Sequence, residues 1–139
     1  MRDHIHSTGW LREANFINGA WLAAYDNQQH SVDDPATGKQ LGSIAWSGTD
    51  ETKLAIDAAH SALTQWAMTT AAERADFLLK IAAIVRENLE DLASLLTLEQ
   101  GKPMTEARAE IKLGADYIQW YAEEARRIKG EIIPSPWKG

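Results

Sequence analysis

The hydrophobic pattern of this chain changes its period once, near residue 49, and this change limits the folds that the chain can adopt. Before residue 49, short apolar runs are separated by turn residues, which is typical of β-strands. After it, apolar residues recur every three or four positions, which is typical of amphipathic α-helices. The sequence therefore predicts a small unit of short strands followed by helices.

The strand signals lie within about residues 15–46. Asn18 and Gly19 stand between two apolar pairs and predict a tight hairpin, because both residues tolerate the positive φ of a type I′ turn. A second turn is predicted further along, where Pro35 fixes φ and Gly38 supplies a left-handed position. A short strand is expected after that turn.

Three helices are predicted, over about residues 50–66, 71–100 and 105–129. Thr49 is the expected N-cap of the first helix. The second helix begins with a capping box formed by Thr70 and Glu73. The residues before the strands, 1–14, show no apolar period and are predicted to form an N-terminal tail.

The composition excludes several classes of function. The 139 residues include no cysteine, which removes a disulfide scaffold, a thiolate metal site and a cysteine nucleophile. The formal net charge of −6 disfavours nucleic-acid binding, which needs a basic surface. No apolar run approaches the ~20 residues that cross a bilayer, and the N-terminus lacks the apolar core of a signal peptide. We therefore expect a cytoplasmic protein with no nucleic-acid or membrane partner.

The common catalytic motifs are missing from the sequence. It contains no glycine-rich dinucleotide fingerprint, no phosphate-binding loop, no H-E-x-x-H zinc motif and no nucleophile elbow. Acidic runs such as residues 87–91 lie beside polar helix faces, so they are interpreted as solvated surface rather than as acid–base pairs. The motifs by themselves thus assign no catalytic and no cofactor-binding residue.

Several segments, taken in their order and spacing, resemble the N-terminal landmarks of the aldehyde dehydrogenase superfamily. These are Phe16-Ile17-Asn18-Gly19-Ala20-Trp21, Asp34-Pro35-Ala36-Thr37-Gly38-Lys39 and Leu98-Glu99-Gln100-Gly101-Lys102-Pro103. Two stretches, Thr97–Pro103 and Tyr117–Arg127, are similar to the succinate-semialdehyde dehydrogenase branch in particular. The resemblance covers about residues 15–134.

This resemblance implies an α/β fold in which residues 15–139 form the first, incomplete part of the cofactor-binding domain. Members of the family are much longer, and they oxidise an aldehyde to the acid with NAD or NADP by means of a cysteine nucleophile. In the family, that cysteine, the glutamate base, the asparagine of the oxyanion hole and the nucleotide-binding loop lie beyond the region that this chain covers. We therefore expect the chain to be inactive alone and to bind no cofactor. The parent enzyme is expected to be a homo-oligomer that acts on an aldehyde such as succinate semialdehyde.

The resemblance also implies two sets of site residues. Val32, Asp33 and Glu99 match positions that hold a structural monovalent cation in many members, and hard oxygen ligands suit such an ion. An ordinary surface carboxylate is the alternative for Glu99. Leu113, Asp116 and Tyr117 fall on the helix that lines the family's substrate tunnel, and ordinary helix packing is the alternative for these three.

Two other functions stay open. A non-catalytic interaction module, which self-associates or pairs with full-length subunits, would also suit a chain with uncovered apolar helix faces. An unrelated helical binding domain would require the ordered segments to coincide by chance.

Overall fold

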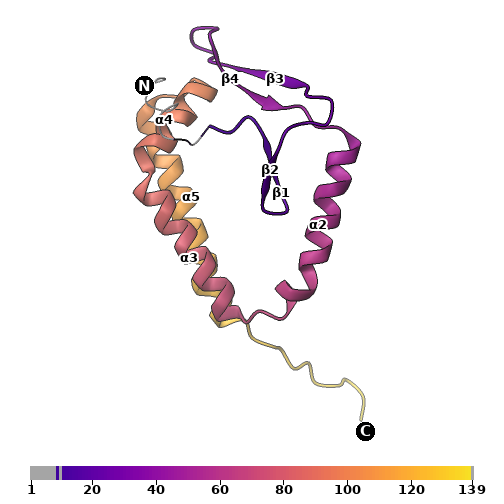
Figure 1. Cartoon of the computed structure of the whole chain (residues 1–139). Helices are drawn as coiled ribbons and strands as arrows, with labels where there is room; N and C mark the ends of the chain where they lie inside the picture. Colours follow the sequence, from indigo (N-terminus) through magenta and orange to yellow (C-terminus); the bar gives the residue numbers. More distant parts are fainter. Residues whose placement is uncertain (1–8, 10, 139) are drawn as a thin grey trace.

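The computed structural model describes residues 9 and 11–138, and this part of the chain contains short strands followed by helices (Figure 1). This order confirms the predicted α/β fragment of a small strand unit followed by amphipathic helices. The elements are β1 (Asn15–Ile17), β2 (Ala20–Leu22), β3 (Gln29–Asp33), β4 (Gln40–Ala45), α2 (Thr49–Ala67), α3 (Ala71–Glu87), α4 (Leu89–Gln100), α5 (Met104–Glu124) and the 3-10 turn η1 (Ala125–Arg127).

The strands form two separate antiparallel hairpins, β1–β2 and β3–β4. The first turns at Asn18 and Gly19, whose φ angles are 51° and 80°, as the sequence predicts. The second hairpin includes β3, to which the sequence pattern assigns no strand of its own because its residues are mostly polar. Pairing with β4 forms this strand, and a bulge interrupts the register between Val32 and Asp33.

The predicted turn between β3 and β4 is confirmed and is organised by Asp34. The Asp34 carboxylate accepts hydrogen bonds from the Ala36 amide and from the Thr37 hydroxyl, both at 2.8 Å. These two donors, the hydroxyl first, lower the pKa of Asp34. Gly38 takes a φ of 66°, the left-handed conformation that the pattern predicts at this position.

The predicted second helix, over residues 71–100, is two helices in the structure. Asn88 ends α3 and begins α4, with φ −107° and ψ 22°. Its amide N–H and its side-chain Nδ2 both donate to the carbonyl oxygen of Ile84, at 3.1 and 2.8 Å. Asparagine competes for backbone hydrogen bonds in this way, which is why it interrupts helices. The apolar pattern continues through this position, so it gives no sign of the break.

Two predicted helix boundaries are also corrected. The first helix is capped at Gly48 and not at Thr49, because the Glu51 carboxylate reaches back to the Gly48 amide at 3.0 Å. The last helix does not extend to residue 129 but ends at Glu124 and tightens into η1. In contrast, the capping box of Thr70 and Glu73 forms as predicted, with the Thr70 amide donating to Glu73 at 2.7 Å.

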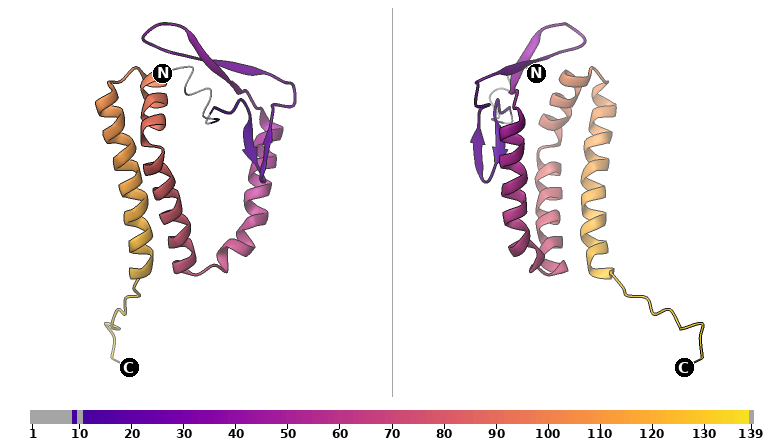
Figure 2. Two further views of the ribbon diagram at one scale, coloured as in Figure 1. Left: turned by 60° about the vertical axis from the view of Figure 1, so that its left-hand side comes forward. Right: turned by 90° about the vertical axis from the view of Figure 1, so that its right-hand side faces the viewer.

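The best-packed part of the described chain lies where α5 runs beside α3 and α4 (Figure 2). The residues buried there are alanines, each no more than 1% exposed: Ala75, Ala82, Ala93, Ala107, Ala115 and Ala122. Small side chains let helix axes approach closely. Ion pairs reinforce this packing at the surface, and the two that join α3 to α5 and α4 to α5 are Arg86–Asp116 and Arg108–Glu90.

Helix α2 stands apart from the other helices and packs on β1 (Figure 1). Its N-terminus is held by Glu51, which is 5% exposed. One carboxylate oxygen of Glu51 accepts a hydrogen bond from the Tyr25 amide at 2.6 Å, and the other accepts from the Gly48 amide. The Tyr25 amide is the main reason why the pKa of Glu51 is lowered. Glu51 therefore ties α2 to the loop that follows β2.

Within the described residues, no helix is both long enough and apolar enough to span a membrane.

The lowered pKa of Glu51 predicts that stability depends on its ionisation. Because its folded-state pKa lies below the ordinary value of 4.5, the contribution is complete above that pH and is lost as the pH falls through the folded-state pKa. Glu51→Gln should lower the thermal unfolding midpoint at neutral pH. It should also reduce the loss of stability between about pH 5 and pH 3, measured by circular dichroism.

Glu110→Gln, which changes an exposed carboxylate that pairs with Lys102, is the control and should keep the pH profile of the original chain. Parallel pH profiles for Glu51→Gln and the original chain would contradict this role for Glu51.

Candidate functional site

The three residues predicted to line a substrate tunnel lie on one side of α5, because Asp116 and Tyr117 follow Leu113 by three and four positions. Leu113 and Tyr117 are 56% and 57% exposed, so packing within this chain does not account for them. Asp116 differs: its Oδ1 accepts a hydrogen bond from Nη2 of Arg86 at 2.8 Å, which joins α5 to α3. The structure thus presents two of the three side chains freely and uses the third in an ion pair.

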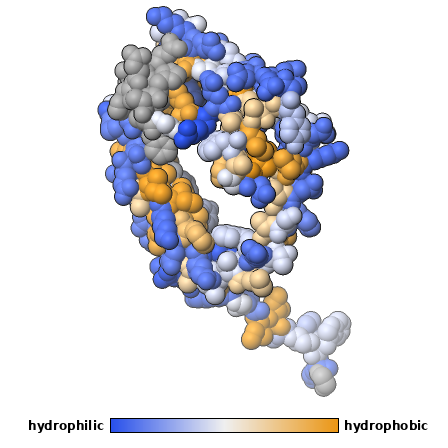
Figure 3. Space-filling model, viewed as in Figure 1, coloured by the Kyte–Doolittle hydropathy of each residue, from blue (hydrophilic) through white to orange (hydrophobic). Residues whose placement is uncertain are grey.

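Leu113 and Tyr117 belong to a larger apolar surface on the helices. Apolar residues gather along the α3–α5 side and on the side that carries the β1–β2 hairpin and α2 (Figure 3). The exposed members include Phe77, Ile81 and Ile84 on α3 and Leu113, Tyr117, Trp120 and Tyr121 on α5, and on each helix they lie on the side away from its buried alanines. We call these two outer sides together the α3–α5 apolar face. A face of this kind marks a surface that another part of a protein covers.

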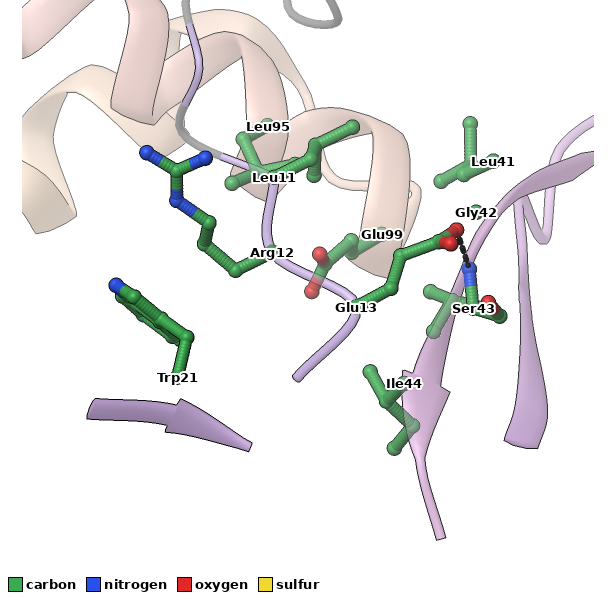
Figure 4. A pocket seen from close by; sticks show the side chains of 11 residues that line it. Leu11, Arg12, Glu13, Trp21, Leu41, Gly42, Ser43, Ile44, Leu95 and Glu99 are labelled. Carbon is green, nitrogen blue, oxygen red and sulfur yellow. Dashed lines mark hydrogen bonds between the residues drawn. The ribbon is translucent and has the colours of Figure 1, made fainter. Parts of the chain in front are cut away.

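The predicted cation ligands are only partly brought together. Val32 and Glu99 line one pocket of about 440 Å³ between β4, α4 and the segment before β1 (Figure 4). Asp33 does not line that pocket, and its carboxylate accepts a hydrogen bond from the Ser31 hydroxyl at 2.5 Å. In the part of the chain that the structure describes, no three histidine or acidic side chains are grouped so that they could hold a metal ion.

Sequence reasoning missed two charged residues at this pocket, Arg12 and Glu13. Glu13 accepts a hydrogen bond from the Ser43 amide at 3.0 Å, and the Arg12 guanidinium lies 5.6 Å from the centre of the Trp21 ring. These residues fall in the segment 1–14 that the sequence predicts as a tail, yet they contact β4 and β2. Residues 1–8 and 10 of that segment lie outside the described residues. The sequence pattern gives no signal for these contacts, because their partners lie on strands later in the chain.

Four described carboxyls are held ionised by hydrogen bonds that serve the fold. Hydrogen bonds lower the pKa of each of these carboxyls. The main donor is the Tyr25 amide for Glu51, the Thr37 hydroxyl for Asp34, the Thr70 amide for Glu73 and Arg108 for Glu90. Catalytic acids and bases work best with a pKa near the working pH, so lowered carboxyl pKa values are suited to capping and ion pairing. With no cysteine in the sequence, a thiolate nucleophile is also excluded from this chain.

The family model of the aldehyde dehydrogenase family matches residues 21–139. The NADP(+) succinate-semialdehyde dehydrogenase of Escherichia coli K12 is 45% identical over 94% of this chain and 27% of its own length. The glutarate-semialdehyde dehydrogenase of Pseudomonas putida is 47% identical over 89% of this chain and 26% of its own length. The chain thus spans about a quarter of the length of these curated relatives.

Solved structures agree with this likeness. Succinate-semialdehyde dehydrogenase from Burkholderia pseudomallei superposes with a TM-score of 0.86 at 45% identity, over 91% of this chain and 26% of that one. Betaine aldehyde dehydrogenase from Staphylococcus aureus superposes with a TM-score of 0.89 at 25% identity, over 97% of this chain and 27% of that one. The chain therefore belongs to the aldehyde dehydrogenase family, and it corresponds to the N-terminal part of its longer relatives.

Proposed function

We propose that this chain supplies the N-terminal quarter of an NAD(P)-dependent aldehyde dehydrogenase that acts on succinate semialdehyde or a similar aldehyde. The observation that carries the proposal is the 45% identity to a succinate-semialdehyde dehydrogenase over 94% of the chain. Relatives named for glutarate semialdehyde and aspartate semialdehyde are 47% and 40% identical. These names share an aldehyde that carries an acid group, and we propose that substrate class for the parent enzyme.

The net reaction proposed for the parent enzyme converts an aldehyde, water and NAD(P)+ into a carboxylic acid, NAD(P)H and a proton. The bound nicotinamide would accept the hydride. The residues of this chain do not fit a nucleotide site, because the glycine-rich turn that approaches a pyrophosphate is absent from the sequence. We therefore assign the chain no step of the chemistry and propose that it positions the parts that perform it.

Two positioning roles follow for the predicted site residues. The exposure of Leu113 and Tyr117 on α5 supports a tunnel wall that is completed by later parts of the parent enzyme, with Asp116 fixing the helix through Arg86. Val32 and Glu99, which line the same pocket, support a monovalent-cation site to which Asp33 would contribute its main-chain oxygen. Both sites require further ligands or walls from outside this chain.

We extend the proposal to a cytoplasmic location and a homo-oligomeric parent enzyme, both of which are expectations from the sequence analysis. The name of the E. coli relative specifies NADP(+). We propose NADP or NAD as the cofactor of the parent enzyme.

The 139-residue chain is expected to be catalytically inactive alone, because it has no cysteine to form the covalent bond with the aldehyde. Purified chain mixed with succinate semialdehyde and either NAD or NADP should reduce the nicotinamide no faster than a protein-free blank. The E. coli succinate-semialdehyde dehydrogenase, assayed by the same ultraviolet absorbance, is the positive control. Reduction of nicotinamide by the 139-residue chain itself would contradict the proposal.

A second function, a non-catalytic interaction module, is favoured by the α3–α5 apolar face. Here the chain would self-associate or pair with full-length subunits to cover that face. Light scattering after size exclusion tests this directly: the module should form one defined oligomer, and Tyr117→Ser should shift it to the monomer. Lys112→Ser, at an exposed polar position of the same helix, is the control and should leave the oligomer intact. A strict monomer for the original chain would count against the module.

A further inference from the structure

The corner between α2 and α3 determines where α2 lies. Helix α2 ends at Ala67 and α3 begins at Ala71, so three residues form the connection. Among the described elements, α2 packs on β1 and has no comparably close packing against α3, α4 or α5. The orientation of α2 relative to the other helices therefore depends on the contacts at this corner and on the contacts at the N-terminal end of α2.

Arg74, in the first turn of α3, reaches back across the corner. Its Nη2 donates to the carbonyl oxygens of Trp66 and Ala67, at 3.1 and 3.3 Å, and its Nε donates to the Thr69 hydroxyl at 2.9 Å. Carbonyl groups in the last turn of a helix lack intrahelical donors, and α2 carries no basic residue of its own there. The Trp66 carbonyl also accepts hydrogen bonds from the amide and the hydroxyl of Thr69, at 3.1 and 2.7 Å. One guanidinium thus joins the end of α2, the connection and α3.

Ring contacts reinforce these hydrogen bonds. The Arg74 guanidinium lies 5.6 Å from the centre of the Trp66 ring, and the Trp66 and Phe77 rings are 5.9 Å apart at an interplanar angle of 43°. A planar guanidinium donates in a fixed fork and stacks on an aromatic face, whereas a lysine ammonium is a point charge on a flexible stem. The arrangement at this corner uses the properties that distinguish arginine.

The far end of α2 is tied independently by Glu51 to the Tyr25 amide. Helix α2 is therefore held at both ends, while larger apolar side chains along it stay uncovered: Ile56 is 61% exposed and Leu63 is 54% exposed. The α3–α5 apolar face, on the helices opposite α2, is likewise uncovered (Figures 1 and 3).

We propose that Arg74 is a positioning residue that fixes the angle between α2 and α3, so that α2 diverges from the exposed apolar side chains of α3 beyond the Trp66–Phe77 contact. This role rests on the proposed function, in which the rest of the parent enzyme covers those apolar surfaces. If α2 and α3 already have the correct relative orientation, assembly with the rest of the enzyme loses less conformational entropy, as in preorganised binding generally. Without Arg74, α2 pivots about the three-residue connection.

Because the sequence has no cysteine, spin labels attach only at two introduced cysteines. Double electron–electron resonance spectroscopy then measures the distance between the two labels. The full chain is labelled at Ser61→Cys on α2 and Lys112→Cys on α5, both at exposed positions. We expect one narrow distance distribution in the doubly labelled chain that keeps Arg74. Arg74→Gln should broaden the distribution at least twofold, and Arg74→Lys should broaden it to an intermediate width. Lys80→Gln removes a cation that lies 5.8 Å from the Phe77 ring, and it is the control that should leave the distribution unchanged.

Circular dichroism shows whether each labelled variant is folded. If Arg74→Gln does not fold, the comparison of Arg74→Lys with Lys80→Gln decides the question in the same way. A broad distance distribution in the labelled chain that keeps Arg74 would overturn the proposal. Distance distributions of equal width in the Arg74 and Lys80 variants would also overturn it. The readout is a distance and not an activity, so a failed dehydrogenase assignment would leave it interpretable.

Discussion

The close packing of α5 against α3 and α4 is the constraint on which the rest of this structure depends. It is made by alanines that are almost fully buried, among them Ala82 and Ala115. An interface of small side chains brings helices together but buries little apolar area per residue. Several larger apolar residues of the same helices, such as Leu78 and Ile118, are half-buried, and others, such as Ile84 and Tyr117, are exposed and belong to the α3–α5 apolar face. The helical unit is thus held together on one side and left incomplete on another.

The parts of the fold that depend on local chemistry are the parts that the sequence predicts. The Asn18–Gly19 hairpin, the Asp34 turn and the Thr70 capping box each involve residues within a few positions of one another. The strand β3 depends instead on its pairing with β4, and the tie between α2 and the loop after β2 depends on a distant partner. Glu51, for example, binds the amide of Tyr25, 26 positions earlier, and no local pattern reveals such a contact.

The candidate site shows the same division. The spacing of Leu113 and Tyr117 places them together on α5, but the partner of Asp116 is Arg86, 30 positions away on another helix. Hydrophobic periodicity could not predict the contacts of Arg12 and Glu13 with the strands either, because the segment before β1 has no periodic pattern. Ordered landmark segments, rather than any catalytic constellation, identified the family. That outcome is expected for a chain that spans only about a quarter of its relatives.

The measurement that tests the central claim most directly is the intact mass of the native protein in its source cells, with an antibody raised against this segment. If the chain supplies the N-terminal quarter of a longer dehydrogenase, denaturing electrophoresis and mass spectrometry should show a single species well above 15.4 kDa. A stable cellular product of 15.4 kDa, with no larger species that the antibody recognises, would contradict the account.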